Sequence, residues 1–138
     1  MRSSAARDRT ERVDAICERR AALAPAFSKL NRTERIVAVC DAVIDIAAAL
    51  FNVSGRELRH PGRSPLGVAR VRQIAMYVTH VTLRMSMRDV GDGFGRDRTT
   101  VLYACHQVED MRDDEDFDQV VVLLERIVRA AFGETDDD

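Results

Sequence analysis

Residues 70–107 read RVRQIAMYVTHVTLRMSMRDVGDGFGRDRTTVLYACHQ, and this stretch decides the fold. Two helical patterns flank a short turn that carries a glycine, and the second helix opens with the residues Arg96, Asp97, Arg98, Thr99 and Thr100. Forked guanidinium donors and small hydroxyls at the start of a helix are typical of a recognition helix, which meets base edges and phosphates there. The pattern therefore predicts a helix-turn-helix.

Three segments of this stretch carry a family likeness. They are Arg72–Tyr77 (RQIAMY), Gly91–Gly95 (GDGFG) and Arg96–Cys105 (RDxTTVLxAC, where x marks the positions of Arg98 and Tyr103, which are not part of the likeness). In this order they resemble the C-terminal DNA-binding domain of DnaA, the family of bacterial chromosomal replication initiators. The resemblance covers about residues 35–112 and implies an all-α fold, a helix-turn-helix helical bundle of the DnaA C-terminal domain type.

The resemblance also implies which residues contact DNA. Arg63, with Ser64 beside it, matches a basic loop whose arginine reaches into the minor groove. Arg70, Arg72 and Gln73 lie in the first turns of the long helix, where phosphate contacts fix the register of the protein on DNA rather than its sequence preference.

The start of the recognition helix is expected to read bases. Arg98 can bond a guanine edge bidentately, and threonine methyl groups can touch a thymine methyl while their hydroxyls hold phosphate. Asp97 fits two roles, because it can cap the helix or accept a hydrogen bond from a cytosine amine. Ala104 is small where a bulky side chain would hold the helix out of the groove. The family usually has His where Arg98 stands, so a changed base preference is expected. The full predicted contact set is Arg63, Ser64, Arg70, Arg72, Gln73, Arg96, Asp97, Arg98, Thr99, Thr100 and Ala104.

Periodic apolar residues predict helices upstream of this stretch. A first apolar stripe lies between Asn31 or Thr33, either of which can cap a helix, and Asn52, which can close one. Ser54 followed by Glu57 then reads as a capping box for a short helix.

Within the stretch and beyond it, three further boundaries are expected. A long helix covers roughly Gly67–Leu83, and a short helix opened by Ser86 leads to the turn. The acidic stretch Glu109–Asp118 is expected to break the pattern of the recognition helix, and a last helix follows over about Phe117–Phe132.

The domain organisation follows from these elements. Residues 1–9 are polar and are expected to be disordered, and residues 10–132 form a single helical domain. Its first helix begins at Thr10, ends before Pro25 and has no counterpart in the initiator's DNA-binding domain. Residues 133–138 form an acidic tail after the last helix.

The net charge of −2 hides a strong asymmetry along the chain. Residues 56–106 hold nine arginines against four acidic side chains, a balance of +5, whereas residues 107–138 hold three arginines against twelve, a balance of −9. This distribution favours an anion-binding surface in the middle of the chain and an acidic end that can compete for it, although two solvated faces would show the same pattern.

Several functional classes lack their residues. No apolar stretch is long enough to span a bilayer, and no signal peptide pattern is present, so a cytoplasmic, nucleoid-associated protein is expected. Three cysteines at wide spacing predict free thiols, with no metal and no cofactor. The chain has no phosphate-binding loop for a nucleotide and no catalytic constellation, so it is not expected to be an enzyme.

Two functions remain open. The first is sequence-specific binding of double-stranded DNA at sites like the initiator's boxes, in the regulation of replication initiation or transcription. The alternative is a protein-interaction module that binds the replication initiator or its AAA+ regulators without reading DNA.

Overall fold

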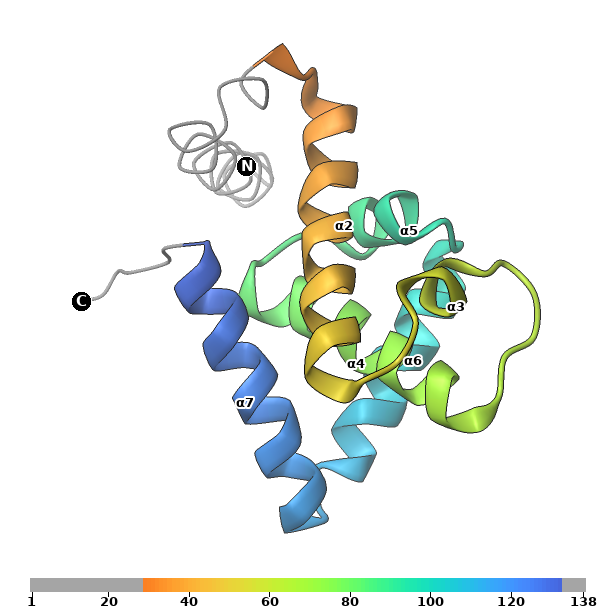
Figure 1. Cartoon of the computed structure of the whole chain (residues 1–138), viewed down its shortest axis with the longest axis vertical. Helices are drawn as coiled ribbons and strands as arrows, with labels where there is room; N and C mark the ends of the chain where they lie inside the picture. The colour runs from red at the N-terminus through yellow and green to blue at the C-terminus, as the bar shows by residue number, and fades with distance from the viewer. Residues whose placement is uncertain (1–28, 133–138) are drawn as a thin grey trace, which may run out of the picture.

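A computed structural model describes residues 29–132 of the chain, and this part is built of helices without strands (Figure 1). The all-α prediction is therefore confirmed. The predicted helix over residues 10–24 and the acidic tail lie outside the described residues. The helices are α2 (Arg32–Phe51), α3 (Gly55–Arg59), α4 (Leu66–Thr82), α5 (Met87–Phe94), α6 (Arg98–Met111) and α7 (Glu115–Ala131).

Helix α2 is bounded by the two asparagines that the sequence suggested. The Asn31 side chain accepts a hydrogen bond from the Glu34 amide, and the Glu34 side chain accepts one from the Asn31 amide, which completes a capping box. At the other end Asn52 adopts the left-handed conformation, with φ 56°, and stops the helix. The apolar stripe between these two caps consists of residues at helical spacing, of which all but the half-buried Leu50 lie in the core: Ile36, Val39, Cys40, Val43, Ala47 and Leu50.

Helix α4 is the central element, and α2, α6 and α7 pack around it (Figure 1). Because neighbours cover it on several sides, its buried positions extend well beyond one stripe and include Ile74, Met76 and Val78. The helix begins and ends one residue before the predicted bounds. Near its end Thr82 is buried and Val81 is exposed.

Helices α5 and α6 form the helix-turn-helix. The Ser86 hydroxyl caps α5 by accepting a hydrogen bond from the Asp89 amide, as predicted. Gly95 ends α5 with φ 71°, a backbone conformation that residues with a side chain rarely adopt. A Cβ at Gly93 would lie 2.7 Å from the Cβ of Cys40, so the missing side chain allows α5 to pack closely on α2.

The prediction that the recognition helix breaks at the acidic stretch is wrong in its extent. Helix α6 continues through Glu109 and Asp110 to Met111, because both of these residues lie at the surface of the bundle while Val108 remains in the core. Only residues 112–114 separate the last two helices, and Asp114 caps α7.

A polar cluster ties α7 to the rest of the bundle. The Tyr77 hydroxyl donates to Glu109 Oε2 at 2.6 Å, and Arg112 Nη1 donates to the Tyr77 oxygen at 3.0 Å. Arg112 also pairs with Asp118 and Glu125 of α7. Burial, with the hydrogen bond to Glu109, raises the pKa of Tyr77 to about 12. The cluster joins α4, α6 and α7 at a place that apolar periodicity does not reveal.

Cys40 and Cys105 are free and buried, and burial raises the pKa of both thiols, that of Cys105 to about 11. Within residues 29–132, no group of three or more potential metal ligands gathers. No helix in the same range is long and apolar enough to cross a membrane.

Candidate nucleic-acid interface

The start of α6 presents its polar residues to solvent. The Asp97 carboxylate caps the helix by accepting a hydrogen bond from the Thr100 amide at 2.8 Å, and this bond lowers the pKa of Asp97 below its ordinary value. Arg98, Thr99 and Thr100 are all exposed in the first turn. The helix therefore offers a guanidinium, two hydroxyls and the positive end of its dipole at one point.

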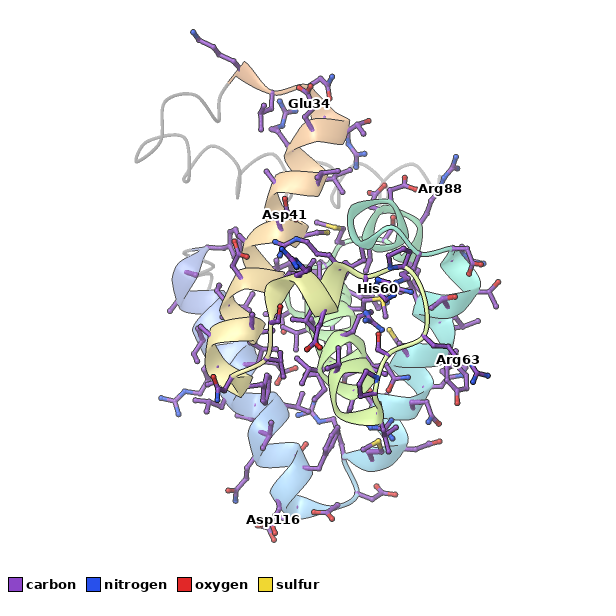
Figure 2. All side chains as sticks on the ribbon, turned by 45° about the vertical axis from the view of Figure 1, so that its right-hand side comes forward. Glu34, Asp41, His60, Arg63, Arg88 and Asp116 are labelled. Carbon is purple, nitrogen blue, oxygen red and sulfur yellow. The ribbon has the colours of Figure 1, made fainter. Side chains whose placement is uncertain are left out.

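The loop between α3 and α4 lies against the turn that precedes α6. Arg96 Nη2 donates to the backbone oxygen of His60 at 2.6 Å, and Arg96 Nη1 donates to that of Pro61 at 3.2 Å. Arg63 is exposed further along this loop, as Figure 2 shows. The structure thus brings the predicted loop arginine and the predicted recognition helix together through Arg96.

The structure corrects the predicted role of Arg72. This side chain is only 7% exposed, and its Nε and Nη2 atoms donate to the backbone oxygens of Leu58 and Glu57 at 2.9 and 3.0 Å. Nη2 also donates to the Ser64 hydroxyl at 2.7 Å. Arg72 shapes the loop from inside rather than offering its guanidinium to a phosphate.

Arg72 and Arg96 lie close enough for their charges to interact. Burial, and then the charge of Arg96, lower the pKa of Arg72. Among the described residues the hydrogen-bond acceptors of both guanidinium groups are carbonyls and one hydroxyl, which leave the positive charges uncancelled. Two positively charged guanidinium groups therefore lie beside the loop, and their charge favours the binding of an anionic ligand there.

Two more predicted residues lie next to each other on α4. Arg70 Nη1 donates to Gln73 Oε1 at 2.8 Å, and both side chains are partly exposed. This bond directs the Arg70 guanidinium toward Gln73, about one turn further along α4. Both residues remain available at the surface.

Ala104 also differs from its predicted role. Its side chain is 1% exposed and belongs to the core, so its small size serves packing inside the bundle rather than the approach of α6 to a groove. The exposed face of α6 instead continues through Tyr103 and His106.

Acidic side chains gather elsewhere on the molecule. The end of α6 and the beginning of α7 expose a group of carboxylates that we call the acidic corner: Glu109, Asp110, Asp113, Asp114, Glu115 and Asp116. In Figure 2, Asp116 lies at the bottom of the molecule, whereas Arg63 lies on the loop between α3 and α4, at the right of the view. The charge asymmetry read along the chain is therefore also a separation in space.

The backbone anchors of the site could not be predicted from the sequence. The oxygens of Leu58, His60 and Pro61 receive the two arginines, and the residue types at these positions carry no signal of that role, because every residue has a carbonyl oxygen.

An exposed, capped second helix, reached through a glycine turn and flanked by a basic loop, defines a helix-turn-helix domain of the nucleic-acid-binding class. The model of the bacterial DnaA protein helix-turn-helix family matches residues 40–108, half of the chain. The chain therefore belongs to this family, and the resemblance seen in the sequence is confirmed.

One curated relative is the chromosomal replication initiator protein DnaA of Mycobacteroides abscessus, which is 39% identical over 87 residues. The match covers 62% of this chain and 18% of the relative, so the chain spans about a fifth of the length of that initiator. The family match ends at Val108 and so leaves α7 outside it.

Proposed function

We propose that this protein binds double-stranded DNA sequence-specifically, at sites like the initiator's boxes, and thereby regulates replication initiation or transcription. The start of α6 enters the major groove, and Arg63 on the loop reaches the adjacent minor groove. The observation that carries this proposal is the pair of hydrogen bonds from Arg96 to His60 and Pro61, which joins the two binding elements into one unit. With DNA as its ligand, the protein works at the nucleoid of a bacterial cell.

The exposed residues divide between reading and positioning. Arg98 can donate two hydrogen bonds to a guanine edge, and the methyl groups of Thr99 and Thr100 can contact thymine. Arg70 and Gln73 hold phosphates beside α4. The Ser64 oxygen accepts from Arg72, so its hydroxyl hydrogen is free to bond a phosphate oxygen.

The acidic corner restricts the part of α6 that DNA can approach. Carboxylates at the end of α6 repel phosphates, so DNA approaches α6 at its first turns and does not extend along the whole helix. The positive end of the helix dipole favours the same approach.

A gel-shift titration tests the proposal with initiator-box duplex and a scrambled duplex of equal length, each at two salt concentrations. We expect tighter binding to the initiator-box duplex than to the scrambled duplex. The affinity for both should fall as salt rises, because arginines displace counterions from phosphates. Equal, salt-sensitive binding to both duplexes would leave only a nonspecific contact. No binding to either duplex, or to any member of a random duplex pool, would contradict the proposal and favour the module that binds the initiator or its AAA+ regulators.

A further inference from the structure

Leu66 is the most exposed large hydrophobic residue in the described part of the chain. Its exposed fraction is 72%, against 59% for Tyr103 and 44% for Val81 and Leu123. With so much of its surface exposed, Leu66 contributes little to the core. The position of Leu66, together with its exposure, indicates that it contacts a ligand.

Leu66 is the first residue of α4, directly after the loop that carries Arg63. The loop is held on both sides, by Arg72 through the Ser64 hydroxyl and by Arg96 through the backbone of His60 and Pro61. Leu66 is therefore presented on an anchored segment, so little ordering entropy is lost when it meets a ligand.

The surroundings of Leu66 are suited to a polyanion. The first turn of α4 holds no acidic residue, and Pro65 makes no side-chain hydrogen bond that caps its amides. A Cβ added at Gly67 would find no atom within 4 Å, so another molecule can approach the backbone closely there. Arg63 and Arg70 are charged neighbours along the chain, and neither forms an ion pair within residues 29–132. Positive charge around an apolar side chain complements phosphates that flank the C–H groups of deoxyribose rings and bases.

We infer that Leu66 is a DNA-contact residue, and that it packs its side chain against sugars and base edges in the groove that Arg63 enters. This inference rests on the proposed DNA-binding function and adds an apolar contact to it. Apolar side chains in a narrow groove exclude water and can wedge against a base step, so they favour sequences that deform easily. Leu66 thereby contributes to the choice of site as well as to affinity.

The test uses the full chain and a duplex that the wild-type protein selects from a random pool. Leu66→Ala and Leu66→Gln should lower affinity by about three- to tenfold, because buried apolar surface is lost. Leu66→Met should keep wild-type affinity, because it retains an apolar side chain of similar volume. The dependence of affinity on salt should stay unchanged in all three variants, since an apolar contact displaces no counterion.

Two controls make the result specific. Val81→Ala removes an exposed apolar side chain near the other end of α4 and should leave affinity unchanged. Arg63→Ala should lower the salt slope by about one unit, which an apolar contact does not do. Thermal unfolding should be the same in every Leu66 variant, because the side chain is exposed.

Wild-type affinity in Leu66→Ala and Leu66→Gln would overturn the inference and leave DNA binding intact. An equal loss in Leu66→Met would overturn it as well, because apolar volume would not be the property that matters. If the wild-type protein selects no duplex from the pool, the proposed function itself fails, which is a different result.

Discussion

The guanidinium of Arg96 donates to the backbone oxygen of His60, a residue 36 positions earlier in the chain, at a distance of 2.6 Å. This bond connects the loop before α4 to the turn before α6. Replacing Arg96 with lysine keeps the charge and removes the planar fork that reaches two carbonyls. We expect weaker preference for the cognate duplex in Arg96→Lys, with nearly the same salt slope, measured by gel-shift titration.

Amide hydrogen exchange checks whether the loop is the cause. The amides of residues 60–64 should exchange faster in Arg96→Lys than in the wild-type protein. An unchanged exchange rate with reduced preference would mean that Arg96 contacts DNA directly.

Arg98→Ala should weaken specific binding more than nonspecific binding. Arg98 is exposed in the first turn of α6, and a bidentate contact to guanine provides roughly 1–3 kcal/mol of discrimination. The measurement is the affinity ratio between the cognate and scrambled duplexes. The control is Arg126→Ala, which removes an exposed arginine from α7 and should leave that ratio unchanged. If Arg98→Ala retained the full ratio, Arg98 would not read bases.

Arg72→Ala should unfold more easily than the wild-type protein. The change leaves the oxygens of Leu58 and Glu57 without their buried donor, and hydrogen bonds to charged groups contribute roughly 1.5–3 kcal/mol each. We expect a loss of about 3 kcal/mol or more in the free energy of unfolding, measured by urea denaturation. Arg70→Ala, which breaks only a bond to Gln73 at the surface, should lose much less. Equal stability of the two variants would contradict the internal role of Arg72.

Asp97 should make stability depend on pH in the acidic range. The hydrogen bond from the Thr100 amide lowers the pKa of Asp97 below its ordinary value of 3.8. The charged cap is therefore favourable above about pH 3.8 and is lost as the pH falls through the lower, folded-state pKa. Asp97→Ala should be less stable than the wild-type protein at pH 7. The difference between their free energies of unfolding should shrink as the pH falls below the ordinary pKa of 3.8. Parallel pH profiles of Asp97→Ala and the wild-type protein would contradict this role of the charged cap.

Tyr77 should affect stability in the alkaline range. Burial and the hydrogen bond to Glu109 raise the pKa of Tyr77 from 10.0 to about 12, so the folded state holds a phenol proton that the unfolded state releases. This contribution is present below about pH 10 and is lost as the pH rises toward 12. In chemical denaturation at several pH values, Tyr77→Phe should lose less stability over that window than the wild-type protein. Parallel pH profiles of the two proteins would show that the phenol proton is not linked to folding.

Local patterns in the chain determined the fold class and most helix boundaries. Asn31, Ser54, Ser86 and Asp97 cap helices by accepting hydrogen bonds from amides two or three residues ahead, so the bonding partner lies within the same few residues of sequence. The same locality explains why sequence alone predicts the turn at Gly95 and the polar opening of α6, because both depend on neighbouring residues only.

Tertiary structure alone decided which basic and small residues face outward. Arg72 and Arg70 are two residues apart on one helix, but Arg72 is directed inward to carbonyls 14 and 15 positions away, while Arg70 stays near the surface. Ala104 is similarly buried by the way α6 packs in the bundle. Residue type reports the chemistry that a side chain can perform, whereas its partners are set by contacts between distant segments. Backbone carbonyls, the acceptors that hold Arg72 and Arg96, are present at every position, so only the folded chain shows which of them are used.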